Sequence, residues 1–155
     1  MLPASYDCPV RRILLLVAVV AAAVAVGGSG SARGAARATL IAFRTPSGNI
    51  GCVFDSESPT SASLRCDIRT GLRPRPAKPP RCDLDWGDSY TMSPRGRVVL
   101  TCHGDTAILP QSHVVRYGTR WSKSGFVCVS RVTGLRCTNR SGHGFFMSRA
   151  HSYRF

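Results

Sequence analysis

His103 and Asp105 are the residues whose types and spacing come closest to a catalytic arrangement. Two positions apart in a β-strand, they would share a face, where a carboxylate can orient an imidazole that acts as a general base. No nucleophile accompanies them, and a histidine beside a cysteine at a strand end usually serves as a structural hydrogen-bonding residue. We therefore expect no catalytic residue here. A small secreted hydrolase using His103 and Asp105 is the alternative function.

Residues 71–81 form a basic, proline-rich stretch. Its four prolines exclude a helix and an interior strand, so we expect an extended, polyproline-like crossing with its basic side chains pointing outward. Those basic residues are Arg73, Arg75, Lys78 and Arg81. The stretch is either a stiff connector between two hairpins or an arm that binds polyanions, and its four basic residues are the candidate binding residues.

The charge of the chain restricts the partners it can have. Its 21 Lys and Arg residues against 8 Asp and Glu give a formal net charge of +13 at pH 7. This charge favours an anionic envelope polymer or a lipid headgroup, although arginines spread over a solvated surface would give the same total. No recognised nucleic-acid motif is present, so no specific nucleic acid is expected. The sequence favours a non-enzymatic binding or structural module with a weak preference for anionic ligands.

Acidic and aromatic residues offer two further candidates. Asp83, Asp85 and Asp88 surround Trp86, but no glutamate closes an EF-hand loop, and the histidines lack the HExxH spacing of zinc sites. We therefore expect neither a metal nor a cofactor. Aromatic residues interleaved with arginine could stack on a sugar or a base, although such residues usually fill the cores of small β domains. They are Trp86, Trp121, Tyr90, Tyr117, Phe145 and Phe146.

Two stretches bracketed by cysteines, Cys52 to Cys66 and Cys128 to Cys137, repeat one pattern. The matched positions are Ser47-Gly48 with Ser124-Gly125, Leu64-Arg65-Cys66 with Leu135-Arg136-Cys137, and Arg69-Thr70-Gly71 with Arg140-Ser141-Gly142. Between the cysteines of each copy lie small, turn-prone residues flanked by apolar and β-branched ones. This is typical of a hairpin with a disulfide across its two strands.

A third hairpin is expected between Cys82 and Cys102. Sequential pairing places one disulfide across each hairpin: Cys52–Cys66, Cys82–Cys102 and Cys128–Cys137. It is one of the roughly 15 pairings that six cysteines permit, and we favour it because each pair then encloses one hairpin. The first disulfide closes a loop of 14 residues, which stabilises the fold by about 3 kcal/mol in the chain-entropy picture.

The spacing of short apolar segments predicts the fold class. Strand-like segments recur about every 8 to 12 residues with turn residues between them, which predicts an all-β fold: a small disulfide-stapled sandwich or barrel of short antiparallel hairpins. No window has a period of about 3.6 with caps, so little helix is expected. We expect strands at 50–54, 64–68, 89–92, 98–102, 106–109, 114–117, 126–129, 135–138 and 145–148, and a turn at 118–125.

Residues 1–38 have the pattern of a signal peptide. Arg11-Arg12 precede an apolar run of 14 residues, 13–26, and Ala36-Arg37-Ala38 offers a cleavage site. The run is shorter than the roughly 20 residues that span a bilayer, and an uncleaved anchor is the alternative. Cleavage leaves one domain, 39–155, whose six cysteines predict a disulfide framework. We expect a monomer without a transmembrane span, secreted or associated with the cell envelope.

The order of several motifs along residues 39–155 resembles one family. The motifs are TPSGNIGC, LRC, TCHGDT, SGFVC, GLRC and SGHGFFMSR. Together they resemble a family of small secreted actinobacterial proteins of unknown function (DUF6636-type). The resemblance implies export and cysteine pairing. Because that family has no established activity, it implies no catalytic residues.

Overall fold

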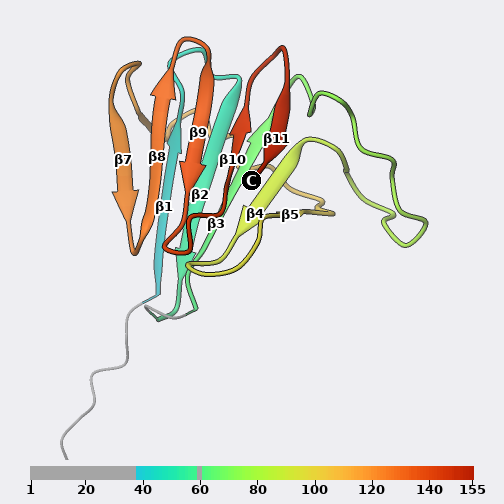
Figure 1. Ribbon diagram of the computed structural model, residues 1–155, viewed down its shortest axis with the longest axis horizontal. Coiled ribbons are helices and arrows are strands. Elements are labelled where there is room, and N and C mark those ends of the chain that lie inside the picture. The colour runs from blue at the N-terminus through green and yellow to red at the C-terminus, as the bar shows by residue number, and fades with distance from the viewer. Residues whose placement is uncertain (1–37, 59–60) are drawn as a thin grey trace, which may run out of the picture. The chain divides into compact units, whose positions relative to one another are not determined.

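Strands whose side chains alternate between inside and outside build two sheets from this chain. The computed structural model describes residues 38–58 and 61–155 (Figure 1), which belong to one unit, Ala35–Phe155. The predicted signal peptide, 1–38, lies outside the described residues apart from its last one, so its presence and cleavage stay predictions. No helix occurs among the described residues, and the predicted all-β fold is confirmed.

The first sheet has six strands in the order β5-β4-β3-β2-β1-β6. They are β1 (Thr39–Arg44), β2 (Ile50–Ser56), β3 (Ser63–Ile68), β4 (Ser89–Met92), β5 (Val99–Leu100) and β6 (His113–Val114). Neighbouring strands are antiparallel, except that β6 runs parallel to β1. Consecutive strands are therefore joined mostly as hairpins, which matches the predicted organisation.

The second sheet has five antiparallel strands in the order β11-β10-β9-β8-β7. They are β7 (Arg120–Lys123), β8 (Phe126–Arg131), β9 (Gly134–Thr138), β10 (Gly144–Met147) and β11 (Ser152–Arg154). The strand β11 ends one residue before the end of the chain. It forms one edge of this sheet.

Aromatic contacts join the inner faces of the two sheets. Phe43 of β1 stacks on Trp121 of β7 with ring centroids 4.5 Å apart, and Phe54 of β2 meets Phe126 of β8 at 6.0 Å. These rings belong to one buried core that also takes inward residues from β3, β4, β9 and β10. Two sheets sharing one apolar core make a sandwich.

The disulfides lie where the hairpins predict them. Cys52 stands directly opposite Cys66 on β2 and β3, and Cys128 opposite Cys137 on β8 and β9. In both pairs the Cα atoms are 4.1 Å apart and the cysteines are fully buried. The third disulfide joins Cys82 to Cys102 outside the sheets, with Cα atoms 5.8 Å apart.

The repeated sequence pattern corresponds to a repeated structure. The four strands β1 to β4 form one run of hairpins and β7 to β10 form another, each with a disulfide across its central hairpin. The matched glycines agree in conformation: Gly71 has a φ of 73° and Gly142 a φ of 77°. Only glycine adopts this left-handed region without strain, which explains why both copies carry it at that turn.

Three segments differ from the prediction. Residues 106–109 form no strand; they lie against Gly51, where an added Cβ would come within 2.6 Å of the Cα of Ile108. Trp121 lies in β7 and not in a turn, because its ring packs on Phe43 while its neighbours are exposed. The strand β11 was not predicted, since two of its three residues are exposed and give no alternation.

Candidate functional site

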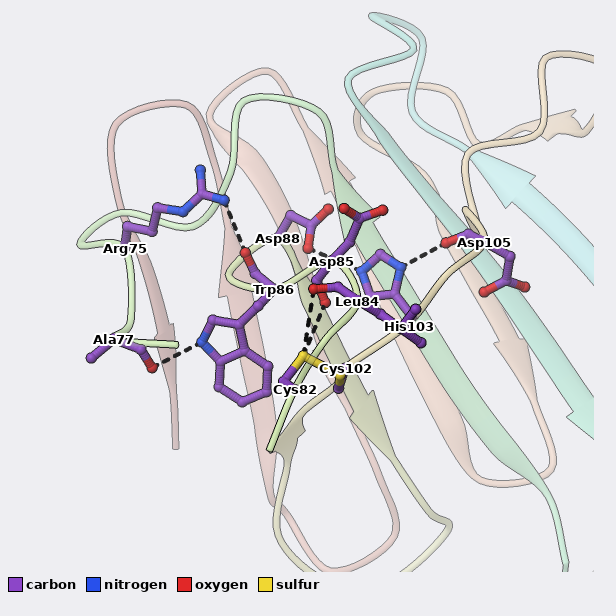
Figure 2. The surroundings of a disulfide bond; sticks show 10 residues. All are labelled: Arg75, Ala77, Cys82, Leu84, Asp85, Trp86, Asp88, Cys102, His103 and Asp105. Atoms are coloured by element: carbon purple, nitrogen blue, oxygen red, sulfur yellow. Dashed lines mark hydrogen bonds and ion pairs between the residues drawn. A yellow bond between two sulfur atoms is a disulfide. The ribbon is translucent and has the colours of Figure 1, made fainter. Parts of the chain in front are cut away.

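The segment from Cys82 to Asp105 places most of the candidate residues beside the first sheet. The Cys82–Cys102 disulfide ties its two ends together. Next to it, Asp85 and His103 form an isolated β-bridge, with Asp85 N–H donating to the His103 carbonyl at 2.8 Å and His103 N–H donating back at 3.2 Å. This short pairing fixes the backbone of His103, so that its ring turns inward (Figure 2).

The His103 ring is buried and both of its nitrogens have acceptors as partners. Nδ1 lies 2.6 Å from the backbone carbonyl of Asp105, and Nε2 lies 3.0 Å from Oδ1 of Asp88. The His103 side chain is 4% exposed. Both ring nitrogens thus face oxygen atoms of fixed groups, one on the backbone and one on the Asp88 carboxylate. The carboxylate that faces His103 is that of Asp88, whereas the Asp105 carboxylate, which the hydrolase alternative would pair with His103, binds Arg65.

The Asp105 carboxylate is bound by Arg65. Arg65 Nη1 donates to Asp105 Oδ1 at 2.6 Å and Nη2 donates to the Asp105 carbonyl at 2.7 Å. The hydrogen bond from Arg65 holds the pKa of the Asp105 carboxyl below its usual value. Burial acts to lower the pKa of Arg65, but hydrogen bonds to Asp67 and Asp105 outweigh burial and raise it. Asp105 thus anchors a loop to strand β3.

These contacts describe a structural histidine better than a general base. Both ring nitrogens are engaged, and no serine, threonine or cysteine side chain is among the hydrogen-bond partners of His103. A base must be within hydrogen-bond reach of the proton it removes, and here both positions are filled by fixed groups. The structure brings together His103, Asp88 and the Asp105 backbone, but no nucleophile.

The three aspartates considered for calcium do not converge. Asp83 and Asp85 are exposed, while Asp88 faces His103. Among residues 38–58 and 61–155 no group of three or more His, Cys, Asp or Glu is placed to hold a metal ion.

The basic stretch 71–81 is held against residues 86 and 87. Arg75 Nη2 donates to the Trp86 carbonyl at 2.9 Å, and Trp86 Nε1 donates to the Ala77 carbonyl at 3.0 Å (Figure 2). Gly87, with a φ of 85°, leaves room for the Arg75 side chain: an added Cβ would lie 3.1 Å from Arg75 Cγ. Arg75 is exposed, and its guanidinium is at the same time held at the Trp86 carbonyl.

The other three basic side chains of this stretch are free. Arg73, Lys78 and Arg81 are exposed, and none of their side chains has a hydrogen-bond or ion-pair partner among the described residues. The backbone carbonyl of Arg73 accepts a hydrogen bond from Ser152 N–H at 2.6 Å, which ties the stretch to β11. The stretch therefore presents three charges from a backbone that is fixed at several points.

The candidate aromatic residues are divided between the core and the surface. Trp121, Tyr90 and Phe145 pack in or against the core. Phe146 stacks on His151 and on Tyr153 on the outer side of β10 and β11, with centroids 5.1 and 5.4 Å apart. These rings therefore contact one another on the surface, where Tyr153 is 47% exposed.

Sequence reasoning missed Asp88, Trp86 and Arg65 as organising residues. Asp88 is 15 positions from His103, and Arg65 is 40 positions from Asp105. Such contacts depend on tertiary structure, and no local spacing signals them. The Trp86 contact had a detectable signal, since a tryptophan beside a proline-rich segment often packs on it.

The fold and these contacts define a small, disulfide-stapled β-sandwich. The chain belongs to a family of unknown function (DUF6636), whose family model matches residues 13–155. No curated protein and no solved structure matches it significantly. In the part of the chain that the structure describes, no helix is long and apolar enough to cross a membrane. Three disulfides are typical of proteins in an oxidising environment.

Proposed function

We propose that the protein is a non-enzymatic binding module that associates with an anionic envelope polymer through Arg73, Lys78 and Arg81, with Arg75 positioning the stretch that carries them. The observation that supports this is the surplus of unpaired positive charge. Residues 39–155 contain 17 Lys and Arg against 7 Asp and Glu. Among the described residues, Arg65 is the only one of these basic side chains in an ion pair. Such a surface attracts a polyanion over a long range.

The fixed backbone of the basic stretch favours binding. Flexible basic arms lose conformational freedom when they bind, and this loss weakens association. Here the hydrogen bonds of Arg75 and Trp86 and the contact from Ser152 already order the stretch. The hydrolase alternative has no comparable support, because the His103 ring is buried between two acceptors.

Export is the second part of the proposal. The signal-peptide pattern of residues 1–38 and the need of three disulfides for an oxidising environment both favour a secreted or envelope-associated, monomeric domain, 39–155. N-terminal sequencing of the protein recovered from its native host tests this proposal. A first residue at Thr39 is expected, and recovery of the intact leader would contradict cleavage.

Binding to soluble polyphosphate, measured by fluorescence anisotropy at 50 and 200 mM salt, tests the binding function. Affinity should fall roughly tenfold or more between these salt concentrations, because counterions are released from the polymer on binding. The variant R73S/K78S/R81S should lose most of the affinity. Arg75 is left unchanged, because its loss would release the stretch from Trp86.

A matched variant with the same charge loss serves as the control. R95S/R116S/K123S removes two arginines and one lysine that are exposed elsewhere, and it should retain most of the wild-type affinity. Equal losses in both triple variants would mean that net charge alone drives binding and would contradict a site at 73–81. Salt-independent binding would overturn the electrostatic basis. A parallel measurement with phosphatidylglycerol vesicles separates a lipid surface from a soluble polymer, and tighter binding to vesicles would also contradict the proposal.

A further inference from the structure

Turns from both sheets meet at one end of the sandwich and enclose a hollow. The turns that join β1 to β2, β8 to β9 and β10 to β11 all lie at the upper edge of Figure 1. A cavity of about 350 Å³ is lined by residues 131–134 and 148–150 of these turns and by Thr45, Ser47, Asn49, Ile50 and Tyr117. That volume is at the lower end of the range for sites that bind small molecules. Loops at the end of a rigid β-sandwich are common places for binding sites.

The walls of the hollow are fixed by hydrogen bonds. In the β1–β2 turn, Gly48 N–H donates to the Thr45 carbonyl at 2.9 Å, and Arg69 Nε donates to the Gly48 carbonyl at 3.0 Å. In the β10–β11 turn, Ser148 and His151 exchange hydrogen bonds through backbone and hydroxyl groups at 2.8 to 3.0 Å. The hollow is therefore preformed, which reduces the entropy that a ligand must remove on binding.

Two arginines give the hollow a positive charge. Arg131, at the end of β8, and Arg149, in the β10–β11 turn, both line it. Both are exposed, neither side chain has a hydrogen-bond or ion-pair partner among the described residues, and no acidic residue lines the hollow. A guanidinium presents several N–H donors in a plane that suits carboxylate and phosphate oxygens. The hollow is thus lined by two guanidinium groups without a partner among the described residues.

Apolar residues also line the hollow. Among them, Ile50 is 4% exposed, while Val132 in the β8–β9 turn is 83% exposed. A β-branched apolar residue is unusual in a tight turn, where glycine, asparagine and serine are preferred. Its exposure costs the free protein hydrophobic stabilisation that a bound apolar group would recover.

We propose that this hollow binds a small organic anion, with its carboxylate or phosphate on Arg131 and Arg149 and its apolar body against Ile50 and Val132. The site is separate from the basic stretch of the proposed function, because no residue of 71–81 lines it. A small-molecule site and a polymer-binding stretch can therefore be tested independently.

The test uses phenyl phosphate as the probe on the oxidised protein, followed by ¹H–¹⁵N NMR. Amide signals of Ser47, Thr133 and Ala150, which line the hollow, should shift in a saturable manner. Benzoate should shift the same signals. Inorganic phosphate has the anionic group without the apolar body, and phenol has the apolar ring without the anionic group. Each should bind at least several-fold more weakly than phenyl phosphate.

Variants assign the binding to its groups. R131Q/R149Q should weaken phenyl phosphate binding at least tenfold while signals elsewhere stay in place, since both side chains lack partners. R95Q/R97Q, which removes two exposed arginines from the β4–β5 turn, should bind as the wild type does. V132S should weaken phenyl phosphate binding but leave inorganic phosphate binding unchanged.

Three results would overturn the proposal. They are no saturable shift of the three amides, equal affinity in R131Q/R149Q and the wild type, or phosphate binding as tight as phenyl phosphate. The R73S/K78S/R81S variant should bind phenyl phosphate normally, so that failure of the polymer proposal leaves this one standing.

Discussion

At the level of single residues, the buried carboxylate of Asp67 holds one loop to the first sheet. It accepts hydrogen bonds from Arg65 at 2.8 and 3.0 Å and from the backbone N–H of Ala107 at 2.7 Å, and it is 1% exposed. We predict that Asp67→Ala lowers the free energy of unfolding by about 3 kcal/mol, because it removes the acceptor of Arg65 Nε and that of the buried Ala107 N–H, while Asp105 still binds the other guanidinium nitrogens. Urea unfolding under non-reducing conditions measures this loss.

The matching control is Asp55→Ala on the neighbouring strand β2. Asp55 is exposed, and its side chain has no hydrogen bond or ion pair with any residue of 38–58 or 61–155, so the loss should stay below about 0.5 kcal/mol. Losses of similar size in the two variants would show that the carboxylate network contributes little.

The ion pair between Asp105 and Arg65 should make stability depend on pH. Because the pKa of Asp105 is lowered in the folded protein, its contribution is present above the ordinary carboxyl pKa of about 3.9 and is lost as pH falls through the lowered value. The side chain is 81% exposed, so Asp105→Asn should cost at most about 1 kcal/mol at neutral pH. Thermal unfolding at several pH values should give a difference that shrinks as the pH falls below the ordinary carboxyl pKa and disappears below the lowered one. A difference that persists there would contradict this assignment.

The candidate site shows what residue spacing can and cannot predict. The sequence places His103 at a strand end beside a disulfide, and this structural role agrees with its two hydrogen bonds. It cannot identify Asp88 as the carboxylate partner, because that contact depends on the bridge between Asp85 and His103. The acidic residue nearest to His103 in the sequence is Asp105, and its carboxylate binds Arg65 of strand β3.

At the level of elements, the C-terminal strand depends on the absence of a side chain at Gly144. Gly144 and Phe155 exchange backbone hydrogen bonds at 2.9 Å, and an added Cβ at Gly144 would lie 2.1 Å from the Cys137 carbonyl and 2.7 Å from the Phe155 ring. We predict that Gly144→Ala destabilises the protein by roughly 1 to 3 kcal/mol or more, because the backbone of β9 must move. Differential scanning calorimetry would measure the change.

Gly104→Ala is the control for this substitution. Its added Cβ would meet the Leu84 side chain at 3.5 Å, an ordinary contact, so stability should change little. Removing the Phe155 ring as well should not restore the stability of Gly144→Ala, because the added Cβ would still clash with the Cys137 carbonyl. Full recovery in the double variant would show that the ring alone causes the effect.

The central hairpins of both sheets were predictable, and the two edge strands of the second sheet were not. The central hairpins β2–β3 and β8–β9 carry alternating apolar residues and paired cysteines, so both their strands and their disulfides follow from the repeated pattern. In contrast, β7 and β11 form the edges of the second sheet. Most of their residues are exposed, so their positions depend on contacts with residues distant in the sequence. Trp121 stacks on Phe43, and Phe155, next to β11, exchanges backbone hydrogen bonds with Gly144.

At the level of the whole molecule, two similar runs of hairpins share one core, and the three disulfides differ in their burial. The disulfides Cys52–Cys66 and Cys128–Cys137 lie inside the core with 0% exposure. The third, Cys82–Cys102, lies outside both sheets, and Cys102 is exposed. A reductant reaches an exposed sulfur in the native state, whereas buried sulfurs become accessible only when the sheets open.

We therefore predict stepwise reduction. At low dithiothreitol concentration, alkylation followed by mass mapping should find Cys82 and Cys102 modified first, while the other four cysteines stay protected. The free energy of unfolding of the singly reduced protein should fall by about 3 kcal/mol, because the loop that the disulfide closes has 20 residues. The backbone amide hydrogens near Asp85 and His103 should exchange with solvent faster. The signals of core residues such as Phe54 should not move, because the two buried disulfides still cross-link the hairpins beside them. Simultaneous loss of all three disulfides, or earlier modification of Cys52, would mean that the segment around Cys82 and the two sheets unfold as one cooperative unit.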